Sequence, residues 1–348
     1  MPYTTINKPA DYFNTVTYTG NGSASGISIT GVGFQPDLLW IKNRSSTPAH
    51  VVYDNVRTSP AKYLLQTNTT VAERTAALGS FDSDGFTVTD NDSFYNSAAN
   101  FVAWNWKGSN VAGGSSNTDG SITSQVSVNT TSGFSIVSYT GNATGSATFG
   151  HGLGVKPKIV IIKNRSAAEG WGYWQDTTNN GTADIRMQLN ATAANYNNLF
   201  VTFNTDTITL PSASDPSWNG SGNSLIAYCF ADVKGFSKIG SYTGNGNADG
   251  PFVYTGFKPA MIIWKNSSNT YNWVISDNKR NTFNDVDKYL LPNTSDAEGT
   301  LALVDFLSNG FKIRTTDASI NNSSDTIIYM AFAENPLVTT GKVPATAR

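Results

Sequence analysis

The sequence predicts an all-β protein built from three tandem antiparallel β-sandwich modules, of which a jelly roll is one version. Three observations predict this fold. One strand-like stretch occurs three times along the chain. Short runs rich in Val, Ile and aromatic residues are separated by turn signals at intervals of roughly 8–12 residues. The composition is poor in charge and rich in Ser, Thr, Asn and Gly, which favours short strands joined by polar turns over helices.

Length and charge narrow the range of functions. The chain has 348 residues, enough for two or three domains, and a third of it is close to the roughly 100 residues of a β-sandwich domain. The formal net charge is −2, so there is no basic field to attract nucleic acid or an acidic membrane. No apolar run reaches transmembrane length, and residues 1–6 lack the pattern of a secretory signal. We therefore expect a soluble chain made in the cytoplasm, without membrane insertion.

The repeated stretch covers residues 36–42, 157–163 and 259–265 and runs from Pro through an apolar segment to Lys. Proline lacks an N–H and fits the first residue of a strand, and a Gly three residues earlier supplies an unusual backbone angle. The apolar segment does not alternate, so we expect both faces of this strand to be covered. Its richness in Ile, Val and Trp favours a strand over a short helix. An Asn follows each Lys and tolerates the turn that leaves the sheet.

The remaining elements follow in a fixed order. Each repeat opens with an aromatic strand that ends in Tyr-Thr-Gly-Asn, at residues 18–21, 139–142 and 242–245. The strand after the Lys-Asn turn ends at an Asp. His50, Trp171 and Trp273 each lie eight residues after the repeated Lys and should occupy one slot in the fold.

A hairpin and a closing apolar strand complete each repeat. The hairpins cover residues 81–86, 203–208 and 306–311, and the first and third carry the Asp-Gly or Asn-Gly that favours a tight turn. The closing strands cover residues 101–106, 225–230 and 327–332.

The junctions set the predicted domains. They are module one at residues 1–107, a Gly/Ser/Asn-rich linker at 108–132, module two at 133–233, and module three with its polar tail at 234–348. The alternation at residues 121–128 is compatible with an extra strand. Only five residues separate modules two and three, so we expect these two to be closely coupled and module one to be more loosely attached.

The sequence offers little for catalysis, and the prediction is a protein that is not an enzyme and has no cofactor or metal. His50 and His151 lie in different modules, and no Gly-x-Ser-x-Gly elbow surrounds a candidate serine. Asp82-x-Asp84-Gly85 starts like a calcium loop but lacks the downstream Glu, so turn chemistry is expected. The single cysteine, Cys229, excludes a disulfide within the chain and is expected in the core.

Aromatic side chains are the remaining candidates for a binding site. Aromatic faces on a sandwich can stack on sugars, with Asn and Asp as hydrogen-bond partners. Repeated slots are more often core than surface, and that alternative stays open for Trp171 and Trp273. The predicted glycan-binding residues are Trp171, Tyr173, Trp174, Trp218, Tyr271 and Trp273.

Four segments of the first repeat resemble a repeat domain of virion structural proteins from tailed phages, typically phages of marine bacteria and cyanobacteria. They are residues 18–21, 33–45, 80–88 and 102–107, and the junction at 119–126 is also similar. The resemblance covers nearly the whole chain, with modules two and three diverging in the loops. It implies a lectin-like sandwich and a virion component, and it carries over no catalytic residues.

The resulting hypothesis is a non-enzymatic structural protein on the phage virion surface. It would act as a capsid decoration, as a fibre or as a tail-associated component. Its partners would be coat or tail subunits and further copies of itself, with a trimer expected by analogy to phage appendages. The alternatives are a tail adhesin that binds host-surface glycans and, with less support, a polysaccharide depolymerase, which would need a paired-carboxylate cleft.

Overall fold

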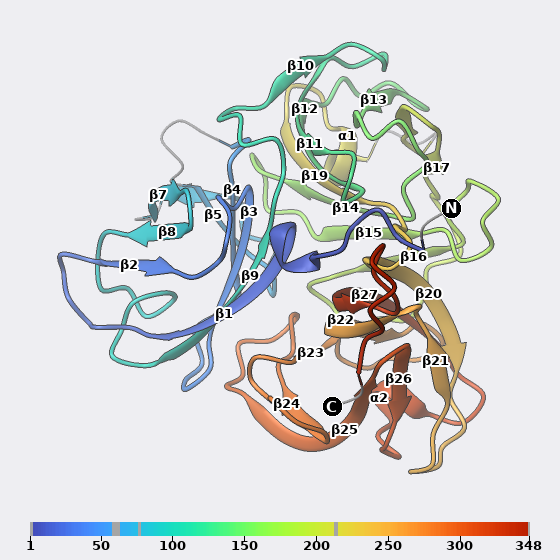
Figure 1. The fold of residues 1–348 in the computed structure, drawn as a ribbon. Helices are drawn as coiled ribbons and strands as arrows, with labels where there is room; N and C mark the ends of the chain where they lie inside the picture. The colour runs from blue at the N-terminus through green and yellow to red at the C-terminus, as the bar shows by residue number, and fades with distance from the viewer. Residues whose placement is uncertain (1–2, 58–62, 76–77, 212–214, 347–348) are drawn as a thin grey trace.

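The computed structural model describes residues 3–57, 63–75, 78–211 and 215–346. Antiparallel strands dominate this part of the chain, which confirms the all-β prediction. Figure 1 shows the sheets in three groups around a common centre, coloured blue to cyan, green to yellow, and orange to red along the chain. We call residues 1–107, 108–233 and 234–348 repeats one, two and three.

The elements of repeat one are η1 (Pro9–Asp11), β1 (Phe13–Thr19), β2 (Ile27–Thr30), β3 (Leu38–Asn43), β4 (Val51–Asp54), β5 (Tyr63–Gln66), β6 (Arg74–Thr75), β7 (Leu78–Asp82), β8 (Gly85–Val88) and β9 (Asn100–Trp106). The larger sheet has the strand order β1-β9-β3-β4-β5-β6, and the smaller sheet has the order β2-β8-β7.

The elements of repeat two are β10 (Ser115–Asn117), β11 (Ser124–Asn129), β12 (Phe134–Thr140), β13 (Thr148–Gly150), β14 (Ile159–Asn164), β15 (Trp171–Gln175), β16 (Ile185–Gln188), β17 (Thr202–Phe203), β18 (Thr207–Thr209), α1 (Pro216–Asn219) and β19 (Ser224–Phe230). They form sheets of the order β10-β11-β12-β19-β14-β15-β16 and β13-β18-β17.

The elements of repeat three are β20 (Ser237–Thr243), β21 (Phe252–Tyr254), β22 (Phe257–Asn266), β23 (Val274–Asp277), β24 (Val286–Tyr289), β25 (Gly299–Leu307), β26 (Gly310–Ile313), α2 (Ala318–Asn321) and β27 (Thr326–Pro336). Their sheets have the orders β20-β27-β22-β23 and β21-β26-β25-β24. In each repeat the opening, closing and proline-led strands therefore lie side by side.

The threefold-repeated stretch forms β3, β14 and β22, and every residue of these strands is buried. This confirms that both faces are covered. The glycines three residues before the prolines, Gly33, Gly154 and Gly256, all have positive φ, between 67° and 87°. A side chain is strained there, so glycine is required. In β22 the proline, Pro259, lies inside the strand and not at its start, and the pairing with β27 shifts register on both sides of it.

Each larger sheet buries one face within its own repeat. In repeat one, residues of the larger sheet such as Leu39 and Ile41 pack against Leu78 and Phe86 of the smaller sheet. Repeats two and three have separate cores of the same kind. These paired sheets are β-sandwiches, as the sequence predicts.

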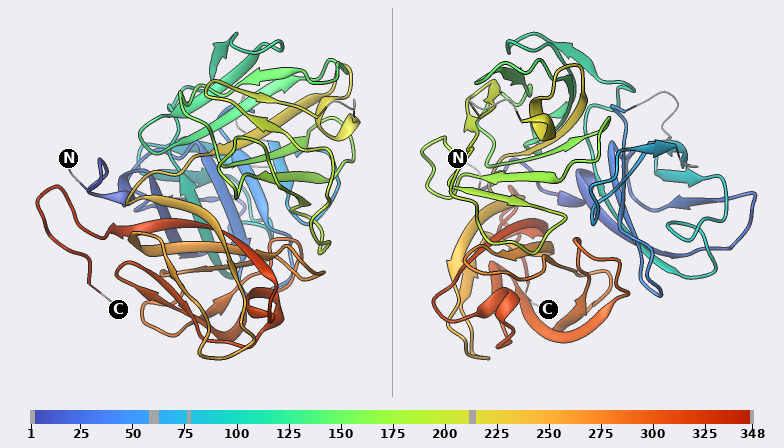
Figure 2. Two further views of the ribbon diagram at one scale, coloured as in Figure 1. Left: turned by 90° about the vertical axis from the view of Figure 1, so that its right-hand side faces the viewer. Right: turned by 180° about the vertical axis from the view of Figure 1, so that it is seen from behind.

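The other face of all three larger sheets is buried in one common core. This core contains Trp104 and Trp106 from repeat one, Tyr228 and Phe230 from repeat two, and Phe332 from repeat three. The two views in Figure 2 agree that the three groups of strands converge on this centre. Because the apolar contacts are shared among all three repeats, the repeats pack as one unit.

The segment predicted as a linker, residues 108–132, differs from the expectation. It contains β10 and β11, which extend the larger sheet of repeat two, and β11 coincides with the alternation at 121–128. Asp37 of repeat one, which is fully buried, accepts hydrogen bonds from the backbone N–H groups of Gly108 and Asn110 and from the Ser127 hydroxyl. Gly108 allows a close backbone approach to Asp37, since a Cβ there would lie 2.9 Å from the Asp37 side chain, and composition alone does not distinguish this role from flexibility.

Candidate functional site

Five of the six aromatic residues predicted to bind glycans are buried. Trp171, Tyr173 and Trp273 belong to the common core, and Trp174 and Trp218 to the core of repeat two, with exposed fractions of 3% or less. Stacking on a sugar needs an exposed ring face, which these residues do not present. Tyr271 is the exception, since it is half-buried and lines a surface cavity.

The repeated lysine joins each repeat to the next. Lys42, Lys163 and Lys265 are fully buried, and each ammonium group donates to backbone carbonyl oxygens of its own repeat and of one neighbour. The bonds between repeats are Lys163 to Thr70 (3.0 Å), Lys42 to Ser295 (3.2 Å) and Lys265 to Thr192 (3.1 Å). The lysine of repeat two thus bonds to repeat one, the lysine of repeat one to repeat three, and the lysine of repeat three to repeat two. We call this closed arrangement the ring.

Two joints of the ring carry a bidentate ion pair. Arg165 of repeat two binds Glu73 of repeat one through Nε and Nη2 at 2.8 and 2.9 Å. Arg44 of repeat one binds Glu298 of repeat three in the same way, at 2.9 and 2.8 Å. Repeat one, which the sequence suggests is loosely attached, therefore takes part in both pairs. Paired parallel hydrogen bonds of this kind fix geometry as well as adding energy.

At each of these two joints a buried aspartate forms further bonds between the repeats. Asp54 pairs with Arg57 at 2.5 Å and accepts the Tyr228 hydroxyl of repeat two at 2.7 Å. In the described residues the third joint has no such ion pair, and it is made by hydrogen bonds to backbone oxygens, from the Asn195 N–H to Ser267, from Lys265 to Thr192 and from the Trp273 indole N–H to Gln188. Asp277 repeats the Asp54 arrangement with Arg280 and the Trp104 indole N–H.

Burial lowers the pKa of Lys42, Lys163 and Lys265 from 10.5 to about 8. The unfolded chain keeps the ordinary value, so between about pH 8 and pH 10.5 it binds more protons than the folded chain, and folding is favoured as pH rises. We expect the stability of the wild type relative to Lys163→Met to increase across this window and to be flat below it. Urea unfolding at a series of pH values measures this. Lys279→Met, at an exposed position, is the control, and an equal pH dependence in both variants would contradict the prediction.

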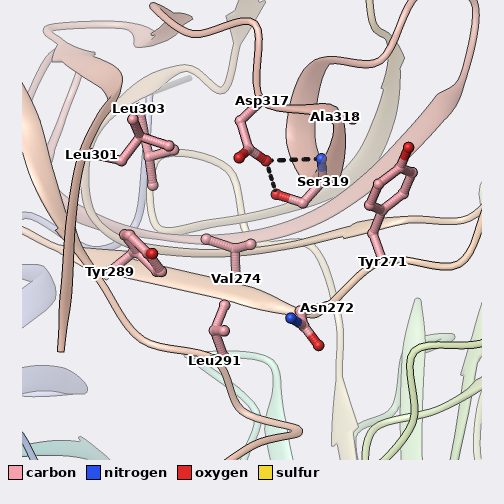
Figure 3. A pocket seen from close by; sticks show the side chains of 10 residues that line it. All are labelled: Tyr271, Asn272, Val274, Tyr289, Leu291, Leu301, Leu303, Asp317, Ala318 and Ser319. Atoms are coloured by element: carbon pink, nitrogen blue, oxygen red, sulfur yellow. Dashed lines mark hydrogen bonds between the residues drawn. The ribbon is translucent and has the colours of Figure 1, made fainter. Parts of the chain in front are cut away.

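The surface cavity of repeat three lies between β23, β24, β25 and α2, with a volume of about 260 Å³. Figure 3 shows Tyr271 and Tyr289 on opposite sides, Val274 and Leu291 between them, and Asp317 across the opening. Leu301 at the rim is 40% exposed, so the cavity is open to solvent. Pockets for drug-sized ligands are roughly 300–1,000 Å³, and this one suits a single side chain or a small ring.

Asp317 presents one free carboxylate oxygen beside this cavity. Its Oδ1 accepts hydrogen bonds from the Ser319 N–H at 2.9 Å and from the Ser319 hydroxyl. Among the described residues no donor bonds to Oδ2, and no cation pairs with Asp317. The sequence analysis identified Tyr271 but missed Tyr289 and Asp317, because nothing in their local pattern separates them from ordinary strand and cap residues.

The other candidate residues have structural partners. Asp84 accepts the backbone N–H groups of Gly31 and Gly33, as turn chemistry predicts. His50 is buried against Trp104 and accepts the Trp40 indole N–H, and burial holds its pKa well below the usual value. Cys229 lies in the core, where burial raises its pKa to about 12. In the described residues no three His, Cys, Asp or Glu side chains group as metal ligands, and no helix is long and apolar enough to span a membrane.

Comparison with known proteins gives one match. A family model described as a domain of unknown function, DUF7483, matches residues 8–336. No curated protein and no solved structure matches the chain. The matched region runs through all three repeats and ends at the last residue of β27.

Proposed function

We propose that this chain, which belongs to the DUF7483 family, is a non-enzymatic structural protein of a tailed-phage virion surface, acting by protein–protein binding. It would decorate the capsid, form part of a fibre or belong to the tail. Its partners would be coat or tail subunits and other copies of itself.

One observation carries this proposal. Two of the four segments that resemble phage virion repeats supply contacts of the ring. Residues 33–45 contain Lys42 and Arg44, which hold repeat three, and residues 102–107 contain Trp104, which donates to Asp277. Part of the resemblance therefore rests on residues that join the repeats into a scaffold. A rigid scaffold loses little conformational entropy on binding, and many copies on a particle would add avidity.

The glycan-binding alternative has less support. Five of its six candidate rings are buried, and only Tyr271 reaches a surface cavity. A depolymerase would need two carboxylates flanking a cleft, and the cavity of repeat three contains one, Asp317. The homotrimer expected by analogy stays a prediction.

Gold-labelled antibody against the purified chain, applied to intact particles, tests the proposal. We expect label at many sites on the particle. Label over the head would indicate a decoration protein, and label confined to the tail would indicate a tail component. The control is antibody absorbed beforehand with the purified chain. Particles without specific label would contradict the proposal.

A further inference from the structure

The place that is an open cavity in repeat three is filled by side chains of the chain itself in repeats one and two. Val52, Tyr173 and Ile275 occupy the same position in the three repeats and pair with residues 65, 187 and 290 of the next strand. The residues that come just before these partners, Leu64, Arg186 and Tyr289, are therefore equivalent. On the neighbouring segment, Leu64 pairs with Arg74, the Arg186 carbonyl accepts the Tyr196 N–H, and Tyr289 pairs with Gly299. Arg74, Tyr196 and Gly299 therefore form a second equivalent position. An Asp that caps the following turn or helix is the third common position, at Asp92, Asp215 and Asp317.

In repeats one and two an arginine stacks on aromatic rings at this place. The Arg74 guanidinium lies 5.1 Å from the centre of the Phe94 ring. The Arg186 guanidinium lies 5.0 Å from the Trp218 ring and 5.1 Å from the Tyr196 ring. These distances are those of cation–π contacts.

In repeat two the charge of the equivalent aspartate acts on the guanidinium without an ion pair between them. Burial lowers the pKa of Arg186, and the negative charge of Asp215 acts in the opposite direction. Asp215 is the equivalent of Asp317. The chain thus contains its own example of a guanidinium stacked on two aromatic rings, with this aspartate near enough for its charge to act on it.

Repeat three keeps the aspartate but has neither the arginine nor the rings on which it stacks, and its own rings at the cavity, Tyr271 and Tyr289, come from other positions. Gly299 replaces Arg74, Ser319 replaces Phe94, and Tyr289 takes the position of Arg186. The result is an open cavity with Tyr271 and Tyr289 at its sides and a free oxygen of Asp317 at its opening. In the described residues no cation of this chain occupies it.

We propose that this cavity binds the guanidinium group of an arginine side chain from a partner protein. The partner's arginine would stack against Tyr289 or Tyr271 and pair with Asp317, in the manner in which Arg186 stacks on the rings of Tyr196 and Trp218 in repeat two. Arginine is enriched among the residues that dominate protein interfaces, because its planar fork stacks and pairs with carboxylates at once. The inference deepens the proposed function and rests on it for the identity of the partner as a coat or tail subunit.

The test uses the full chain and N-acetyl-arginine-N-methylamide as the probe. Methyl NMR signals of Val274, Leu301 and Leu303, which line the cavity, report binding. We expect saturable shifts with a Kd on the order of millimolar, as befits one small group. The citrulline analogue, which has the same shape without the charge, should bind about threefold to fivefold more weakly.

Two variants locate the site. Asp317→Asn keeps a capping side chain but removes the charge, and should weaken binding about threefold to fivefold. Tyr289→Arg installs the residue of repeat two, fills the cavity from within and should weaken binding at least about tenfold. Asp206→Asn, which removes an exposed charge in repeat two, should leave the Kd unchanged, and thermal unfolding checks that each variant is folded.

Several results would overturn the inference. These are equal affinity for the arginine and citrulline analogues, no shift of the cavity methyl signals, and tighter binding of a monosaccharide, which would support the glycan alternative. The two proposals fail separately. Specific label on particles without arginine binding would refute only this inference, and arginine binding without label would refute only the virion proposal.

Discussion

Replacing Asp54 with Ala is expected to lower the free energy of unfolding by about 3–5 kcal/mol, the range for breaking a buried ion pair by removing one partner. The side chains of Asp54 and Arg57 are both fully buried. Without Asp54 the Arg57 guanidinium keeps its carbonyl partner on Val52 and a longer ion pair with Glu73 at 3.5 Å but loses its hydrogen-bonded counter-charge. Tyr228 of repeat two loses its hydrogen-bond acceptor at the same time. The variant therefore weakens a joint of the ring as well as repeat one.

Urea unfolding followed by tryptophan fluorescence measures this change. Asp11→Ala is the matched control, since Asp11 forms an exposed pair with Lys8. Such a surface substitution should change the free energy of unfolding by no more than about 0.5 kcal/mol. Equal midpoints for the two variants would contradict the assigned role of the buried pair.

Phe332→Ala is expected to cost about 3–5 kcal/mol and to loosen all three repeats together. The Phe332 ring lies 4.8 Å from that of Phe13, 5.6 Å from that of Trp106 and 5.9 Å from that of Phe230. These neighbours belong to repeats one and two, so the cavity left by the substitution would open at the centre of the ring.

Phe311→Ala removes the same atoms from the core of repeat three alone. The Phe311 ring packs against Tyr242, Trp264 and Tyr329 of that repeat. Amide hydrogen exchange distinguishes the two variants, because it reports the opening of each strand separately. Phe332→Ala should speed exchange in β1, β12 and β20, and Phe311→Ala mainly in repeat three. Effects confined to repeat three in both variants would argue against a shared core.

The local structure could be read from the sequence because its signals are local. The proline-led strand, the positive-φ glycine before it and the buried Cys229 all follow from side-chain pattern and backbone sterics. The hairpin between β7 and β8 likewise follows from Asp84-Gly85.

The arrangement of the repeats could not be read in this way. Trp171 and Tyr173 alternate on β15 as they would on a sheet with a solvent-exposed aromatic face, and their burial depends on sheets from other repeats. The cavity depends on how Tyr289 packs, since its ring lies so close to Gly299 that a Cβ there would clash, and the equivalence of Gly299 with Arg74 and Tyr196 is seen only in three dimensions. Absent side chains leave no pattern in a single sequence.

The closure of the ring has a consequence for synthesis. The Arg44–Glu298 contact joins residues 254 positions apart, so it forms only after most of the chain has been translated. Translation proceeds at roughly 5–20 residues per second, so the last strand that covers the apolar face of the first larger sheet is made on the order of ten to fifty seconds after that sheet. During that time the nascent chain presents Trp104 and Trp106 to water and to other chains. The three repeats share one core, and this core is incomplete until the third repeat has been made. The growing chain therefore needs protection from association with other chains during synthesis.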